Sequence, residues 1–291
     1  MQALVRRDTQ VDVTTRDEGS VTQRAVPGPA LYFTSVVPET PKAWIGLLHG
    51  YADHGARYAH VMEAWAEQGI GCVALDMRGH GRANGARGYC ARFEEFLDDA
   101  GELARLLRDR ARGGACFLFG HSFGGLVAAT SATESPGPWR GLLLSAPYFG
   151  LSMQVPAAKL LAGKVASRVW PSLALPTGIK GTALTHDPAR ATAYDADPLV
   201  FKAATARWFV EATRAQARAI ARAPTLRLPL YEAFGAADPV ASPSAGRAFF
   251  DAAGSEDKTW DGRERLFHEI LNEPEWPTIA KPMGEWVLAH V

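Results

Sequence analysis

The chain has 291 residues, of which 47% are hydrophobic, so it can bury a large core as one domain or as one domain with an insertion. Lys plus Arg and Asp plus Glu both number 31, and the zero formal charge provides no overall field that would attract nucleic acid. We therefore expect a globular protein without a nucleic-acid partner.

The cysteines and the first twenty residues bear on the compartment. Cys72, Cys90 and Cys116 have no metal-ligand spacing, which predicts free thiols, a reducing environment and no metal site. The first twenty residues contain no apolar stretch of signal-peptide length, and no later segment reaches about 18 uninterrupted apolar residues. These patterns predict a cytoplasmic protein, with peripheral membrane association left open.

Short apolar runs alternate with helical patterns through the first half of the chain. An opening hairpin is expected at 21–26 and 30–37, around the turn Pro27-Gly28-Pro29. Buried strands and amphipathic helices should then follow one another in turn. The strands are expected at 43–48, 71–75, from Cys116 and at 141–145, and the helices at 57–68 and 93–112. This alternation predicts an α/β fold with a mainly parallel sheet that is covered by helices on both faces.

The pattern changes between Leu151 and about Arg222. No strand pattern occurs there, and Ala-rich helical stretches are expected at 157–170, 188–194 and 200–222. We predict that this segment, 151–222, is a helical cap over the carboxyl edge of the sheet, inserted into a core of residues 1–150 and 223–291. The core resumes with strands at 228–234 and 258–260 and helices at 244–253 and 277–290.

Residues 116–130 carry the strongest functional pattern. They read as an apolar strand, a Gly-x-Ser-x-Gly turn and an apolar helix, with Ser122 at the centre of the turn. That order is typical of a nucleophile elbow, in which the serine hydroxyl projects beyond the end of the sheet. Gly120, Gly124 and Gly125 are the small residues that such a tight turn requires.

A serine nucleophile needs a histidine base, which follows it in the chain order of this type of site. Only His186, His268 and His290 follow Ser122. His186 falls in the helical insertion and His290 is one residue from the end of the chain. His268 follows the last strand in a loop, so we expect it to be the base.

The carboxylate that orients the base should follow another strand. Asp238 comes directly after the apolar run 228–234, whereas Asp251 and Asp257 lie on or after the next helix. The strand after the elbow ends in Ser145-Ala-Pro147 without a carboxylate. Asp238 is therefore the expected third member of a Ser-Asp-His triad.

Acyl transfer to serine also needs two donors for the oxyanion. The Phe123 amide, next to the nucleophile, should supply one. The second should come from the loop His49-Gly50-Tyr51, where Gly50 permits close approach and the Tyr51 amide is the expected donor. His49 is expected to hold that loop through hydrogen bonds.

Five segments together resemble the α/β-hydrolase superfamily and, within it, the monoacylglycerol lipase and lysophospholipase group. They are 49–58, Asp76-Met-Arg-Gly-His-Gly-Arg82, Gly120-His-Ser-Phe-Gly-Gly125, Asp197-Pro-Leu199 and Phe267-His-Glu-Ile-Leu-Asn-Glu-Pro274. The resemblance implies an eight-stranded hydrolase sheet, the triad and oxyanion donors named above, and a cap whose apolar tunnel holds an acyl chain. It also implies that Arg57 and Tyr194 lie near glycerol hydroxyls. The group usually has Gly-Glu-His where this chain has Ala52-Asp53-His54, so Asp53 is expected to shape the polar pocket.

The function expected from the sequence is a cofactor-free serine hydrolase that cleaves monoacylglycerol to glycerol and a fatty acid. A lysophospholipase or a general carboxylesterase is the alternative within enzymes, and a non-catalytic hydrolase-like binding protein is the alternative from another class. In the first cap helix, apolar side chains alternate with basic ones: Leu160, Leu161, Val165, Val169 and Trp170 with Lys159, Lys164 and Arg168. They are expected to pack the cap onto the core, with docking on a membrane or micelle as the alternative.

Overall fold

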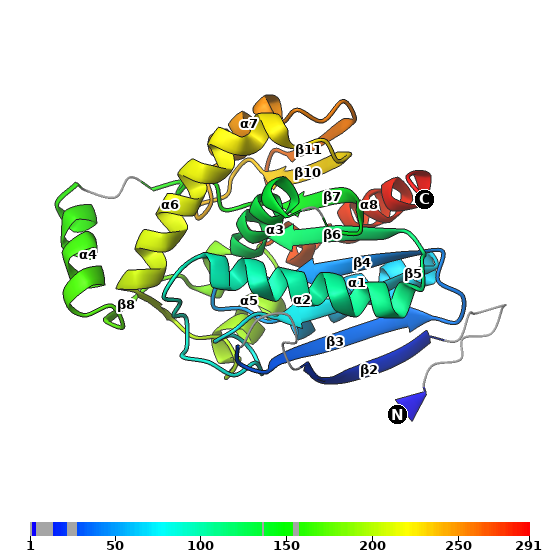
Figure 1. Cartoon of the computed structure of the whole chain (residues 1–291), viewed down its shortest axis with the longest axis horizontal. Coiled ribbons are helices and arrows are strands. Elements are labelled where there is room, and N and C mark those ends of the chain that lie inside the picture. Colours follow the sequence, from blue (N-terminus) through cyan, green and yellow to red (C-terminus); the bar gives the residue numbers. More distant parts are fainter. Residues whose placement is uncertain (1, 4–13, 22–27, 136, 154–156) are drawn as a thin grey trace.

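The computed structural model describes residues 2–3, 14–21, 28–135, 137–153 and 157–291, and only the backbone of 2–3, 14–15, 20–21 and 157–160. A single sheet occupies the centre of the molecule (Figure 1). Its strand order is β1-β2-β3-β5-β4-β6-β7-β10-β11. The strands are β1 Gln2–Ala3, β2 Thr14–Val21, β3 Leu31–Pro38, β4 Ala43–Leu48, β5 Ile70–Asp76, β6 Cys116–His121, β7 Trp139–Ser145, β10 Leu230–Gly235 and β11 Lys258–Arg263.

The expected mainly parallel, eight-stranded sheet is confirmed, with the two-residue β1 added at its edge. The pairs β2–β3 and β3–β5 are antiparallel, and the pairs from β5 onward are parallel. The strand that pairs with β3 covers 14–21, where the sequence predicts none, and the strand expected at 21–26 falls, apart from Val21, on residues outside the description. Residues 22–27 lie outside the described part of the chain.

Helices cover both faces of the sheet, as the fully buried strands require. Strand β4 alternates between the two cores, since Trp44 and Leu48 join one cluster and Ile45 and Leu47 join the other. Helices α2, α3 and α7 pack on the first face, and α1 and α8 pack on the second. Their bounds are α1 Ala59–Glu67, preceded by the 3-10 helix η1 Gly55–Tyr58, then α2 Glu94–Ala111, α3 Phe123–Glu134, α7 Pro243–Ala252 and α8 Pro277–Ala289.

The segment between β7 and β10 is mostly helical, with one departure from expectation. Two three-residue strands, β8 Ala174–Pro176 and β9 Ala203–Thr205, pair with each other in an antiparallel ladder. Strands this short show no periodicity in a sequence, which is why the sequence predicted none. Around them lie α4 Ala157–Val169, η2 Gly181–Ala183, α5 Pro188–Ala196, α6 Ala206–Arg222 and η3 Ala223–Thr225.

Helix α6 begins later than expected and ties the segment to the core. The Thr205 hydroxyl accepts a hydrogen bond from the Trp208 amide and so caps α6 at the end of β9. Near the other end, Arg218 lies 2.6 Å from Glu94 on α2 and 2.9 Å from Glu134 on α3. Figure 1 shows α4 on the outer side of α6, away from the sheet. No helix of the described chain combines the length and hydropathy needed to cross a bilayer.

Glu232 is a buried acid without a compensating contact. It lies on β10, is completely shielded from solvent, and neither carboxylate oxygen has a hydrogen-bond partner among the described residues. Burial raises the pKa of Glu232 well above its usual value, and Arg247 opposes this effect only in part. The folded state therefore keeps the proton that the unfolded chain loses, and stability falls as the pH rises above the usual glutamate pKa.

Glu232→Gln should therefore stabilise the protein at alkaline pH. We expect the free energy of unfolding to rise by about 1–3 kcal/mol at pH 8, because the uncharged amide has no proton to lose. The gain should shrink as the pH falls toward 4.5, the ordinary glutamate value. Denaturant unfolding at several pH values measures this, with the exposed Glu264→Gln as control. A gain of equal size at all pH values would contradict the assignment.

Candidate active site

Ser122 occupies a sharp turn between β6 and α3. Its backbone angles are φ 52° and ψ −119°, a left-handed conformation that non-glycine residues rarely adopt. Its amide donates to the Ser145 carbonyl at the end of β7 (2.9 Å). Its carbonyl accepts from the amides of Tyr148 (2.9 Å) and Leu126 (3.1 Å). The turn is thus held from three directions, and Ser122 lies at the carboxyl edge of the sheet.

Close backbone contacts explain the glycines of the turn. A Cβ atom at Gly120 would lie 2.4 Å from the Gly124 carbonyl oxygen, and one at Gly124 would lie 2.2 Å from the Leu48 carbonyl oxygen. Neither neighbour is a flexible side chain that could move aside. The two positions therefore require glycine, and the expected strand, turn and helix arrangement is present.

The structure brings Ser122, His268 and Asp238 together, although they come from three separate loops. Ser122 Oγ lies 2.8 Å from His268 Nε2, and His268 Nδ1 lies 2.7 Å from Asp238 Oδ2. All three residues are buried. A Cβ at Gly235 would lie 2.3 Å from the Leu266 carbonyl oxygen, so this glycine allows the loop before His268 to lie against the end of β10.

The hydrogen bonds of Asp238 determine which nitrogen of His268 carries the proton. Its other oxygen, Oδ1, accepts from the amides of Val240 (2.7 Å) and Ala241 (3.0 Å), which fixes the carboxylate. The carboxylate accepts from Nδ1–H of His268, so Nε2 is left to accept the Ser122 hydroxyl proton. Burial alone would lower the pKa of His268, yet the Asp238 carboxylate raises it above the ordinary value of 6.5.

The loop after β4 lies beside Ser122. A Cβ at Gly50 would be 3.5 Å from the Ser122 Cβ. His49 Nε2 accepts from the Met77 amide (3.0 Å), so its Nδ1–H donates to the Gly50 carbonyl (2.7 Å). Because the carbonyl and N–H of a trans peptide point in opposite directions, this bond turns the Tyr51 N–H away from His49. His49 therefore holds the loop, as expected from the sequence.

A cavity of about 290 Å³ opens beside Ser122 and His268. The Tyr51 and Phe123 residues expected to supply oxyanion donors both line it, and Phe123 is the first residue of α3. The Tyr51 ring stacks on the Trp208 ring of α6 with centroids 3.5 Å apart. Most of the apolar wall comes from the inserted segment: Leu151, Met153, Ile179, Leu184, Trp208 and Phe209.

The polar end of the cavity differs in one respect from the sequence prediction. Asp53 and Tyr194 line the cavity, whereas Arg57, expected near the glycerol hydroxyls, is not among the lining residues. Arg57 donates to both carboxylate oxygens of Glu269 (2.7 Å each) and to Asp53 Oδ1 (3.0 Å). Its guanidinium is 4.9 Å from the Tyr194 ring centre. Arg57 thus positions the two acids, because its guanidinium is paired with both carboxylates.

Glu269 also lines the cavity, a position that the sequence does not predict. Its position next to His268 in the motif was the available signal. Burial would raise the pKa of Glu269 and of Asp53, but the shared Arg57 guanidinium lowers both below their usual values. Two carboxylates around one guanidinium leave the polar end with a net negative charge.

Comparison with known proteins identifies the family. The profile of the family described as "Serine aminopeptidase, S33" matches residues 39–275. The chain belongs to this hydrolase family. The match covers most of the chain, including β4, the elbow and the His268 loop. The identification of the chain as an enzyme of the α/β-hydrolase superfamily is confirmed.

Several relatives of this chain carry the names of lipid ester hydrolases. The monoacylglycerol lipase of Mycolicibacterium smegmatis is 29% identical over 96% of this chain and 99% of its own length. Phospholipase YtpA of Bacillus subtilis is 30% identical over 84% of this chain and 94% of its own length. The crystal structure of Paleococcus ferrophilus monoacylglycerol lipase superimposes with a TM-score of 0.80 at 29% identity, covering 90% of this chain and 99% of that one. The similarity to the monoacylglycerol lipase group is confirmed.

Asp238→Asn should impair hydrolysis without disturbing the fold. An amide at this position presents a donor to His268 and favours the wrong tautomer, so kcat should fall by about 10⁴-fold. Loss of the carboxylate that raises the pKa of His268 should also shift the acid limb of the residual activity to lower pH. Hydrolysis of p-nitrophenyl butyrate across pH 5–9 measures both effects.

The matched control for this variant is Asp251→Asn, an exposed acid on α7 that pairs with Arg247. It should leave kcat and the pH profile unchanged. Wild-type activity in Asp238→Asn would remove Asp238 from the site.

Proposed function

We propose that the chain is a serine hydrolase that cleaves the carboxylic ester of monoacylglycerols, with Ser122, His268 and Asp238 as its catalytic triad. The observation that carries the proposal is the continuous hydrogen-bonded chain from Ser122 Oγ through His268 to Asp238 beside an apolar cavity. Such a chain activates a serine hydroxyl that is otherwise a poor nucleophile at neutral pH.

The reaction proceeds in two halves. His268 Nε2 takes the Ser122 proton as Oγ attacks the ester carbonyl, and Asp238 stabilises the resulting imidazolium. His268 then protonates the leaving glycerol oxygen, which leaves an acyl-enzyme on Ser122. A water molecule, deprotonated by His268, attacks the acyl carbon and releases the fatty acid.

The oxyanion of each tetrahedral intermediate would be held by the amides of Tyr51 and Phe123. Phe123 is at the positive end of the α3 dipole, which favours a developing negative charge. The His49 bond to the Gly50 carbonyl supports the role of the Tyr51 amide, since it orients that peptide before substrate arrives. Preorganised donors of this kind contribute about 2.7–4 kcal/mol each in other serine hydrolases.

The two ends of the cavity favour a monoacylglycerol. The apolar wall suits an acyl chain, and the Asp53 and Glu269 carboxylates suit the hydroxyls of glycerol, which can donate to them. The net negative charge around Arg57 opposes a head group of net negative charge, which disfavours an anionic lysophospholipid. The relatives named monoacylglycerol lipase support the same substrate.

We further propose that residues 151–222 act as a cap that contacts a lipid surface at the cytoplasmic side of a membrane. The wall that this segment contributes to the cavity supports the first part. The alternative, that its apolar helix packs onto the core, conflicts with the exposure of Leu161 (64%), Val165 (55%), Val169 (81%) and Trp170 (61%). The side chain of Leu160 lies outside the described residues. The free, buried Cys72, Cys90 and Cys116 suit a reducing compartment.

The substrate proposal predicts a marked preference among esters. We expect kcat/KM for monoolein to exceed that for lysophosphatidylglycerol by about tenfold or more, because the negative polar end repels its anionic head group. Ser122→Ala should lower kcat by about 10⁴-fold or more. Product analysis by chromatography, with alanine p-nitroanilide as a test of aminopeptidase activity, separates the possibilities. Preferred cleavage of the lysophospholipid or of the anilide would overturn the proposed substrate.

A further inference from the structure

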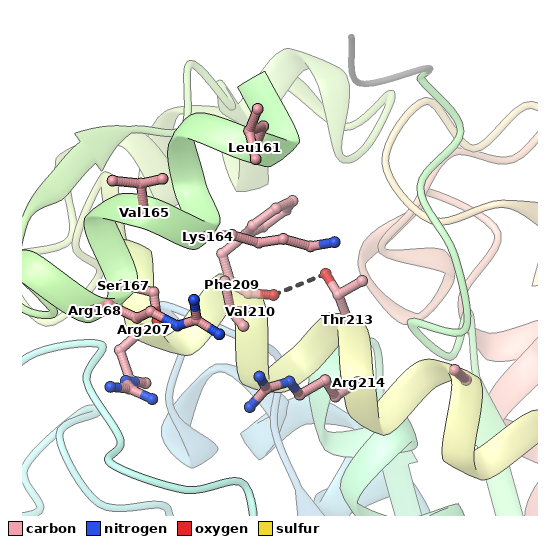
Figure 2. Close-up of a pocket in the computed structure, with 11 residues that line it drawn as sticks. Leu161, Lys164, Val165, Ser167, Arg168, Arg207, Phe209, Val210, Thr213 and Arg214 are labelled. Carbon is pink, nitrogen blue, oxygen red and sulfur yellow. Dashed lines mark hydrogen bonds between the residues drawn. The ribbon is translucent and has the colours of Figure 1, made fainter. Parts of the chain in front are cut away.

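A second cavity lies within the inserted segment, on the outer side of α6. It has a volume of about 550 Å³ and is enclosed by one face of α4 and one face of α6 (Figure 2). Its α4 residues are at positions 161, 164, 165, 167 and 168, and all but Ser167 recur at helical spacing. We call this cavity the outer groove. It shares Phe209 with the cavity beside Ser122, so this residue borders both.

The outer groove concentrates positive charge. Lys164 and Arg168 reach it from α4, and Arg207 and Arg214 reach it from α6, as Figure 2 shows. Glu211 is the neighbouring acid, and its carboxylate lies 3.7 Å from Arg207 and 2.9 Å from Arg214. Among the described side chains, one carboxylate against four cations leaves a local surplus of three positive charges. The chain as a whole has a formal charge of zero, so this surplus is a property of the groove.

Apolar side chains border the same groove. Leu161 and Val165 line it and are more than half exposed, and Val169 and Trp170 continue the exposed surface at the end of α4. Met153, 67% exposed, lines the other cavity beyond Phe209. Cationic groups next to exposed apolar side chains match the boundary between head groups and acyl chains in a bilayer.

We propose that the outer groove binds the phosphate group of an anionic phospholipid in a membrane surface. Guanidinium groups suit this ligand because they donate paired hydrogen bonds to phosphate oxygens, and three of the four cations are arginines. The apolar side chains of α4 enter the adjoining acyl region. The occupant is a membrane lipid and not a substrate, since neither Ser122 nor His268 lines the outer groove.

This inference deepens the proposed lipid contact of the cap by naming the lipid. A head group bound beside α4 and α6 orients the protein on the membrane. It brings the exposed Met153, at the edge of the cavity beside Ser122, toward the bilayer. An uncharged ester dissolved in that bilayer then reaches the Ser122 cavity without crossing water. Binding to the lipid surface does not depend on ester cleavage, so the two can fail separately.

The test is sedimentation with vesicles of phosphatidylcholine alone and of phosphatidylcholine containing about 30% phosphatidylglycerol. The chain carrying Ser122→Ala is used, so that no lipid is hydrolysed. We expect clear preference for the anionic vesicles. Adding Lys164→Gln and Arg168→Gln should weaken that binding by about 20- to 30-fold, because each basic residue near an anionic surface contributes about fivefold. Binding to neutral vesicles should change little.

The matched control removes two exposed positive charges outside the inserted segment, by Arg140→Gln on β7 and Lys281→Gln on α8. It should retain the binding to anionic vesicles. Unchanged hydrolysis of p-nitrophenyl butyrate by Lys164→Gln/Arg168→Gln, with Ser122 intact, verifies folding. Equal binding to both vesicle types, or equal loss in the control, would overturn the proposal. Binding of free oleate that depends on Lys164 and Arg168, without vesicle preference, would assign the groove to a fatty acid and also overturn it.

Discussion

The strained turn at Ser122 is the constraint on which the rest of the structure depends. A non-glycine residue at φ 52° and ψ −119° costs about 1–3 kcal/mol, and the neighbouring strands provide the contacts that hold it there. The turn requires α3 to approach β6 and the end of β4 so closely that Gly120 and Gly124 admit no side chain. In return, the hydroxyl of Ser122 stands at the carboxyl edge of the sheet, where the loops after β4, β10 and β11 also begin.

The sequence predicts much of this arrangement because parallel strands bring their carboxyl ends to one edge. The apolar runs locate those strands, and the residues directly after them, Ser122 and Asp238, must then lie near one another. Contacts between distant positions are less accessible. Arg57 and Glu269 are separated by 212 positions, and nothing in either segment indicates that one guanidinium serves Asp53 and Glu269 together. The resemblance therefore places Arg57 near the glycerol hydroxyls, whereas in the structure Glu269 lines the cavity and Arg57 does not.

The structure of the inserted segment is also only partly predictable from the sequence. Its helices are predictable from their spacing, but β8 and β9 are too short to produce a pattern. An amphipathic helix also does not indicate what covers its apolar side. Val165 and Val169 of α4 were expected against the core and are exposed.

Charge is separated within this chain of zero net charge: the polar end of the Ser122 cavity is negative and the outer groove is positive. Helix α6 lies between them, with Trp208 on the cavity side.

The central claim is that the geometry around Ser122 makes this one hydroxyl a nucleophile. The most direct measurement is reaction with a fluorophosphonate, followed by mass spectrometry of the peptides. A single phosphonyl group on the peptide that contains Ser122, formed fastest above the raised pKa of His268, is the predicted result. Attachment to another serine, or no adduct in folded protein, would contradict the account.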